Sequence, residues 1–112
     1  MKITGKTIWI TGASSGIGEA LSIEAIKKGA HVILSARNLH KLEDLKQRLE
    51  KISPGSTTLM PMDVTKKEDI VRSVETVTKT MKRVDILINN AGVSQRGLVA
   101  ETPVEVDRMI LE

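Results

Sequence analysis

The sequence predicts an α/β fold in which a doubly wound parallel sheet lies between two layers of helices. Strand-like and helix-like stretches alternate from end to end, as in successive βαβ units. A glycine-rich stretch, "TGASSGIG", joins the first strand-like stretch to the first helix-like one. The chain has 112 residues and is 40% hydrophobic, enough for one domain with a core. We therefore expect one domain over residues 1–112.

The first strand and helix flank the glycine-rich stretch. Residues 6–12, "KTIWITG", form a short β-branched apolar run that a glycine closes. Residues 16–29, "GIGEALSIEAIKKG", then place Ile17, Leu21 and Ala25 at helical spacing and end at Gly29. One strand followed by one helix is the expectation.

The second pair follows directly. Residues 31–36, "HVILSA", read as a buried strand, and residues 38–52 as a helix. The helix carries one apolar stripe that we expect to face the core: Leu42, Leu45, Leu49 and Ile52.

The third strand is predicted over residues 57–64, "TTLMPMDV". Pro61 lacks a backbone N–H, so this strand should lie at a sheet edge. A helix should follow over residues 65–83, opened by a capping box of Thr65 and Glu68. The side chains expected on its buried face are Ile70, Val74, Val77 and Met81.

A fourth strand and helix complete the pattern. The run in "VDILINNAG", residues 84–92, predicts a strand buried on both faces that ends at Asn89 and Asn90. In "TPVEVDRMILE", residues 102–112, Thr102 is the expected N-cap, Pro103 the first helical residue and Glu105 the capping-box partner.

Composition excludes several classes of function. The formal charge of +3 comes from lysines scattered among carboxylates, and one Trp with no Phe or Tyr gives no platform for stacking bases, so we expect no nucleic-acid partner. The chain has no cysteine, and its 2 histidines have no carboxylate cluster at ligand spacing, so no metal site is expected. No apolar stretch reaches the ~18 residues of a membrane segment. The expected location is the cytoplasm.

The glycine-rich turn has the chemistry of a phosphate site. The N-terminus of the following helix offers unpaired N–H groups and a partial positive charge. Gly12 permits a tight turn, Gly16 lets a pyrophosphate approach the backbone, and Gly18 lets the helix pack on the strand. Ser14 and Ser15 can add hydroxyl donors. The stretch suits a dinucleotide, although a glycine-rich turn that binds nothing is the alternative.

The end of the second strand favours one dinucleotide. An NAD site needs a carboxylate about 20 residues after the glycines. This sequence has Ala36 near that position with Arg37 beside it, and a guanidinium suits the 2′-phosphate of NADP(H). A solvated arginine at a strand end is the alternative.

Taken together, "TGASSGIG", "LSAR", "DV" and "NNAG" resemble the classical short-chain dehydrogenases/reductases. The resemblance implies a three-layer Rossmann-type sheet with strand order 3-2-1-4, truncated relative to the family. It implies that the pyrophosphate and adjoining ribose are held by Gly12, Ser14, Gly16, Ile17 and Gly18. It also implies that Arg37 binds the 2′-phosphate, with Ser14 or Asn38 as helpers, that Asp63 and Val64 bracket the adenine, and that Asn90, Ala91 and Gly92 support the central strand and the nearby ribose. The plainer alternatives are a turn or cap role for Asp63 and a loop role for Asn90.

The family's catalytic residues are a Tyr, a Lys four residues later, a Ser and an Asn. This chain has no tyrosine, so we expect it to hold the N-terminal, cofactor-binding part of a longer protein and no catalytic residue. The function implied is hydride transfer between NADP(H) and an alcohol or carbonyl substrate, with the 112-residue chain inactive alone. The alternative is a non-catalytic nucleotide-binding or interaction module. The fourth strand would be left as an open apolar edge, so we also expect a homo-oligomer.

Overall fold

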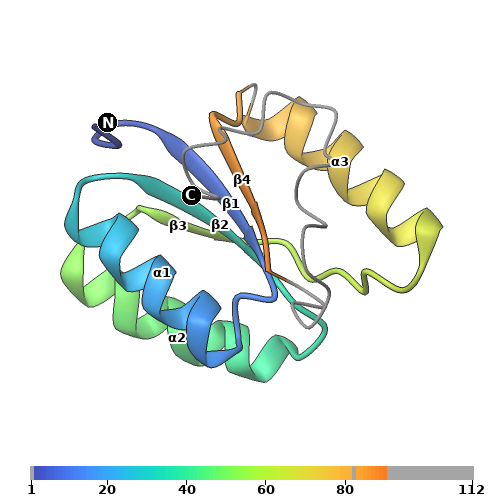
Figure 1. Cartoon of the computed structure of the whole chain (residues 1–112), viewed down its shortest axis with the longest axis horizontal. Helices are drawn as coiled ribbons and strands as arrows, with labels where there is room; N and C mark the ends of the chain where they lie inside the picture. Colours follow the sequence, from blue (N-terminus) through green and yellow to red (C-terminus); the bar gives the residue numbers. More distant parts are fainter. Residues whose placement is uncertain (1, 82, 91–112) are drawn as a thin grey trace.

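A computed structural model describes residues 2–81 and 83–90 of the chain. The elements follow one another as β1 (Thr7–Thr11), α1 (Gly16–Lys27), β2 (His31–Ser35), α2 (Leu39–Ile52), β3 (Thr57–Leu59), α3 (Lys67–Met81) and β4 (Ile86–Asn89). The helix expected over residues 102–112 lies outside the described residues. Strands and helices alternate along the described chain, as the sequence predicts (Figure 1).

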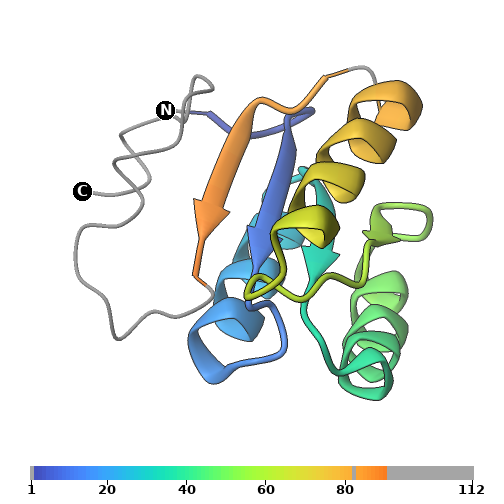
Figure 2. The same cartoon turned by 90° about the vertical axis from the view of Figure 1, so that its right-hand side faces the viewer.

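The four strands form one parallel sheet with the order β3-β2-β1-β4. The strand β1 lies in the middle, with Ile10 opposite Leu34 of β2 on one side and opposite Ile88 of β4 on the other. Figure 2 shows β1 and β4 side by side and pointing the same way. The expected strand order is confirmed, and β3 lies at a sheet edge as Pro61 predicts.

Helices cover both faces of the sheet. In Figure 1, α1 and α2 lie together on one face and α3 lies on the other. The first face holds Ile8, Ile10, Val32 and Leu34 against the buried leucines of α2 and Ala25 and Ile26 of α1. The second face holds Trp9 and Ile33. They pack with Val77 of α3 and with Met62, which lies between β3 and α3. Neighbouring residues of one strand thus enter different cores, because side chains alternate across a strand.

Several details differ from the sequence expectations. The strand β3 ends at Leu59, so Pro61 follows the strand rather than lying within it. In β4 only Ile86 is buried and the other residues are half-buried, because β4 is an edge strand among the described residues. Two expected core positions, Ile52 and Val74, are each 46% exposed. Ile52 is the last residue of α2 and Val74 lies at the flank of α3, where periodicity alone overestimates burial.

The capping box expected at the start of α3 is replaced by another arrangement. The helix begins at Lys67, one residue later than a Thr65 cap requires. The Thr65 hydroxyl donates to the carboxylate of Asp63 at 2.6 Å, and the Asp69 carboxylate accepts the N–H of Asp63 at 3.0 Å. A carboxylate in the first turn of α3 still accepts a backbone N–H from the segment before the helix, but this carboxylate belongs to Asp69 rather than Glu68.

Candidate nucleotide-binding site

The glycine turn between β1 and α1 is held in shape by its own hydrogen bonds. Gly12 has a φ of 64°, in the left-handed region that glycine adopts without strain. The Ser15 hydroxyl donates to the Gly12 carbonyl at 2.9 Å and accepts the Gly18 N–H at 3.2 Å. Ser15 is therefore the N-cap of α1. Its hydroxyl hydrogen points into the turn, so the free hydroxyl at this turn is that of the half-buried Ser14.

The two glycines of α1 differ in their surroundings. A Cβ built on Gly18 would lie 2.8 Å from the Ala13 Cα and closer still to the Gly12 carbonyl oxygen. Both are backbone atoms that cannot move aside, so the close packing of α1 on the turn requires glycine at 18. A Cβ built on Gly16 would meet no atom within 4 Å. The space beside Gly16 is open, so the fold itself does not require glycine there.

The N-terminus of α1 fits an anion such as a pyrophosphate. Gly16 and Ile17 are exposed, and within the described residues their N–H groups have no protein acceptor. Such groups at a helix start attract negative charge, and the helix dipole adds to the attraction. The open space at Gly16 lets an anion approach the backbone closely. The donors and the space together suit the phosphates of a dinucleotide.

The end of β4 is joined to the turn through Asn90. This buried side chain donates from Nδ2 to the Gly12 carbonyl at 3.1 Å and to the Ser15 hydroxyl at 2.9 Å. Among the predicted site residues, the structure thus brings together Gly12, Ser15 and Asn90, from opposite ends of the described chain. The predicted Ala91 and Gly92 lie outside the described residues.

Thr11 is a structural residue of the site that the sequence analysis missed. Its hydroxyl accepts the Asn90 N–H at 2.9 Å and lies 2.9 Å from the side-chain oxygen of Asn89. A polar, β-branched residue at the end of an apolar strand, directly before Gly12, was the available signal. Its role becomes visible only once β4 is known to lie beside β1.

Arg37 and Asn38 follow the end of β2 and differ in their engagement. Arg37 is exposed, and its side chain has no ion pair or hydrogen bond with any described residue. Asn38 is the N-cap of α2, and its side-chain oxygen accepts the Lys41 N–H at 3.1 Å. The side-chain oxygen of Asn38 is thus already engaged in capping α2, whereas the guanidinium of Arg37 is available to an anion.

Asp63 and Val64 lie where β3 leads into α3. The Asp63 carboxylate accepts both the hydroxyl and the N–H of Thr65, at 2.6 Å and 2.9 Å. These hydrogen bonds, with a smaller contribution from nearby Arg37, lower the pKa of Asp63. Val64 is 36% exposed and lines a cavity of about 310 Å³ on the α3 face, together with Trp9. The turn role of Asp63 is observed, and its carboxylate lies near enough to Arg37 to be affected by the positive charge of the guanidinium.

Neither a metal cluster nor a membrane span is found in the part of the chain that the structure describes. Its His, Asp and Glu side chains form no group of three that could hold a metal ion. None of its helices has the length and apolarity needed to cross a membrane.

Comparison with known proteins gives one consistent family. The model of the short chain dehydrogenase family matches residues 6–110. The human dehydrogenase/reductase SDR family member 7 is 39% identical over 114 aligned positions, which cover 99% of this chain and 34% of the relative. The chain therefore spans about a third of the length of the curated relatives it matches.

Solved structures agree with the fold and bind different cofactors. L-sorbose reductase from Gluconobacter frateurii, complexed with NADPH and L-sorbose, has a TM-score of 0.71 and 35% identity, over 78% of this chain and 34% of its own. An NAD⁺-bound xylitol dehydrogenase has a TM-score of 0.72 and 25% identity, over 78% of this chain and 33% of its own. The family match over nearly the whole chain, the strand order and the glycine turn agree: this chain belongs to the short-chain dehydrogenase family.

Proposed function

We propose that this chain binds NADP(H) and forms the cofactor-binding part of a short-chain oxidoreductase. The observation that carries the proposal is the pairing of two anion sites at one edge of the sheet. One is the N-terminus of α1, with its unpartnered N–H groups and the open space at Gly16. The other is the unpaired guanidinium of Arg37 at the end of β2. A dinucleotide with a third phosphate has groups for both sites.

In this proposal the diphosphate lies at the turn and the adenosine end lies towards Arg37. The N–H groups of Gly16 and Ile17, with the Ser14 hydroxyl, bind the diphosphate, while Gly12 and Gly18 shape the turn around Ser15. Asp63 and Val64 flank the adenine, and Asn38 contributes from the start of α2. Asn90 keeps the turn in place, with Ala91 and Gly92 assigned the ribose beside it.

Arg37 should decide between the two nicotinamide cofactors. A hydrogen bond to a charged partner contributes about 1.5–3 kcal/mol, which corresponds to a roughly tenfold to hundredfold preference for the 2′-phosphate. No carboxylate occupies the strand end where an NAD site would need one to hold the ribose hydroxyls. The neighbour with bound NAD⁺ shows that the fold alone does not set this preference.

Calorimetric titration of the chain with NADPH and with NADH tests the proposal. We expect tighter binding of NADPH and loss of that preference in Arg37→Ala. Lys51→Ala is the matched control. Lys51 is also exposed, and its replacement removes one positive charge at the far end of α2. Equal affinity for the two cofactors, or the same loss in both variants, would rule out the assigned role of Arg37. No binding of either would favour a non-catalytic interaction module.

The reaction proposed for the whole protein is hydride transfer between the nicotinamide and an alcohol or carbonyl substrate. The nicotinamide supplies or accepts the hydride, and an alkoxide then requires a proton donor. The family's phenol has no counterpart in this chain, which lacks tyrosine, so we expect no turnover by the 112 residues alone. Oxidation of NADPH by the chain with a panel of ketones and aldehydes would contradict this expectation.

We further propose that the chain self-associates and is cytoplasmic. The strand β4 has β1 on one side and an unpaired edge on the other among the described strands. Val71 and Val74 of α3 are also exposed and add apolar surface to the described part of the chain. An edge of this kind is a template for pairing with a second chain. Light scattering at micromolar concentration tests the oligomer, and imaging of a fluorescent fusion in cells tests the location.

A further inference from the structure

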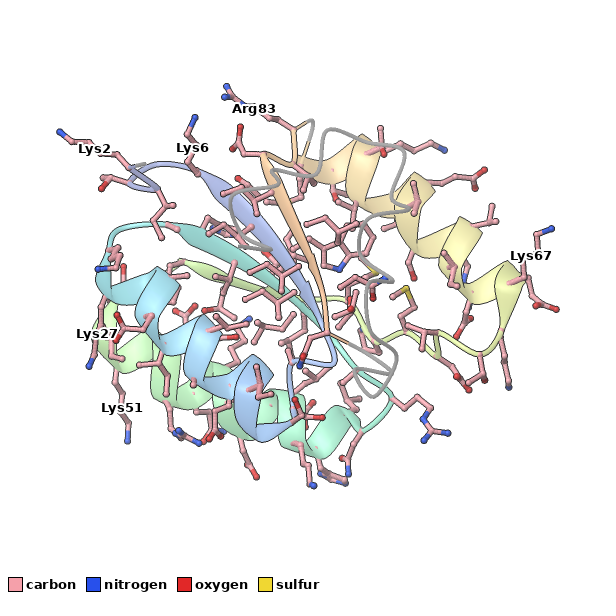
Figure 3. All side chains as sticks on the ribbon, in the orientation of Figure 1. Lys2, Lys6, Lys27, Lys51, Lys67 and Arg83 are labelled. Carbon is pink, nitrogen blue, oxygen red and sulfur yellow. The ribbon has the colours of Figure 1, made fainter. Side chains whose placement is uncertain are left out.

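The edge of the sheet opposite the glycine turn carries a net positive charge. This edge, where the strands begin and the helices end, carries a set of residues that we call the basic face: Lys2, Lys6, Lys27, Lys28, Lys51, Lys79 and Arg83. Five of the six labelled side chains in Figure 3, all except Lys67, lie along this edge. The modest net charge of +3 for the whole chain conceals this segregation.

Helix stability explains only part of the basic face. Lysines in the last turn interact favourably with the helix dipole, and each of the three described helices has one there: Lys27, Lys51 and Lys79. Lys2, Lys6 and Arg83 belong instead to the segments that enter β1 and β4. Strand entry segments have no dipole to complement. The helix dipole therefore does not account for the positive charge of these three residues.

Carboxylates at this edge do not neutralise the basic face. Glu24 lies 4.0 Å from Lys28, and Asp85 pairs with Arg83 at 2.5 Å. The Glu50 carboxylate accepts the N–H groups of Gly55 and Thr57. Within the described residues, no ion pair involves the other members, which are Lys2, Lys6, Lys27, Lys51 and Lys79. In contrast, the acidic residues in the first helix turns lie at the opposite edge: Glu19, Glu68 and Asp69.

The arrangement fits a broad, flat anionic partner. The members come from every layer of the fold, so they spread across one end of a body about 30 Å wide rather than lining a groove. All but one are lysines, which act as point charges and do not impose the bidentate geometry of arginine. Exposed Ile52 lies beside Lys51 and adds an apolar contact at the same edge.

We propose that the basic face docks on the surface of an anionic lipid bilayer. Basic residues near such a surface add to its attraction, and the attraction falls off within a Debye length, so only the face that meets the bilayer counts. The glycine turn, at the opposite edge, then points away from the bilayer and stays open to the cofactor. A nucleic acid is disfavoured because the chain's single Trp is buried and no aromatic side chain is available for stacking.

The test is sedimentation of the 112-residue chain with lipid vesicles. We expect binding to vesicles of equal parts phosphatidylcholine and phosphatidylserine, weakening with added salt, and none to phosphatidylcholine alone. Each basic residue at the surface should contribute roughly a fivefold factor to partitioning. Replacing Lys2, Lys27 and Lys51 together by Gln should therefore lower partitioning by about two orders of magnitude.

A matched variant separates the face from the net charge. Replacing Lys41, Lys66 and Lys67 by Gln removes the same charge from the opposite edge and should leave partitioning nearly unchanged. Replacing Lys2, Lys27 and Lys51 by Arg should retain binding, which shows that a loss in the Gln variant does not reflect misfolding. Absence of binding by the unmodified chain, equal loss in both Gln variants, or tighter binding to duplex DNA than to the anionic vesicles would each overturn the proposal.

Discussion

Replacing Gly18 by alanine should destabilise the fold, whereas the same change at Gly16 should not. At Gly18 the new methyl would lie 2.8 Å from the Ala13 Cα and closer to the Gly12 carbonyl oxygen, inside the contact distance of both. Overpacking of this kind costs about 3 kcal/mol at the upper end of its range, and better helix propensity returns about 1 kcal/mol. The expected net loss is about 2 kcal/mol.

Unfolding by urea or heat, followed by the fluorescence of the single Trp, measures this loss. Trp9 is 6% exposed in the folded chain, so unfolding changes its environment strongly. A loss of about 2 kcal/mol should lower the melting temperature by roughly 8–16 °C for a domain of this size. An unchanged midpoint for Gly18→Ala would refute the argument that the turn and α1 pack too closely for a side chain.

Gly16→Ala is the matched control and separates folding from binding. No atom lies within 4 Å of its added Cβ, so the melting temperature should stay the same or rise slightly. The methyl would instead occupy the space assigned to the diphosphate and weaken NADPH binding by tenfold or more. Unchanged NADPH affinity in a folded Gly16→Ala chain would contradict the proposed phosphate position.

Three further changes test other parts of the structure. Asn90→Asp replaces the amide donor by a charged acceptor that faces the Gly12 carbonyl and the Ser15 hydroxyl. We expect the free energy of unfolding, measured in urea, to fall by about 1–3 kcal/mol. An unchanged midpoint would show that the turn does not depend on this amide. Ser35→Ala leaves the buried Trp9 Nε1–H without its 2.8 Å acceptor and should cost about 1–3 kcal/mol, whereas Ser35→Thr should retain the bond. Burial lowers the pKa of His31 below 6.5, although Glu50 acts in the opposite direction, so the folded chain holds fewer protons than the unfolded one. Its free energy of unfolding should therefore fall as the pH decreases through 6.5, and a slope that is identical in His31→Gln would exclude His31 as the cause.

The fold was largely predictable because it depends on local patterns. Each predicted strand and helix among the described residues is present, since periodicity and glycine positions act over a few residues. The errors concern context. Val74 was expected in the core because it falls on the apolar stripe of α3, but α3 lies alone on its face of the described sheet and its flank is exposed. Glu68 was expected as a cap, but Asp69 is the residue that faces Asp63.

The site was predictable in its glycines and much less so in its polar contacts. Gly12 and Gly18 have the conformational and packing roles that their spacing indicates. The roles of Ser15 and Asn90 depend on the distance between side chains that are 75 residues apart in the sequence. No local pattern encodes such a contact. It follows from the parallel pairing of β4 with β1, which places the end of β4 against the turn.

This dependence means that the nucleotide turn is a product of the sheet and not of its own residues alone. The Gly12 carbonyl receives the Ser15 hydroxyl from within the turn and the Asn90 amide from β4. The Ala13 N–H donates to the Ser35 carbonyl of β2 at 3.1 Å. Three neighbouring strands therefore fix the turn before any ligand binds. Because fixing it in advance reduces the entropy lost on binding, weaker pairing of β4 should reduce cofactor affinity even when every glycine is present.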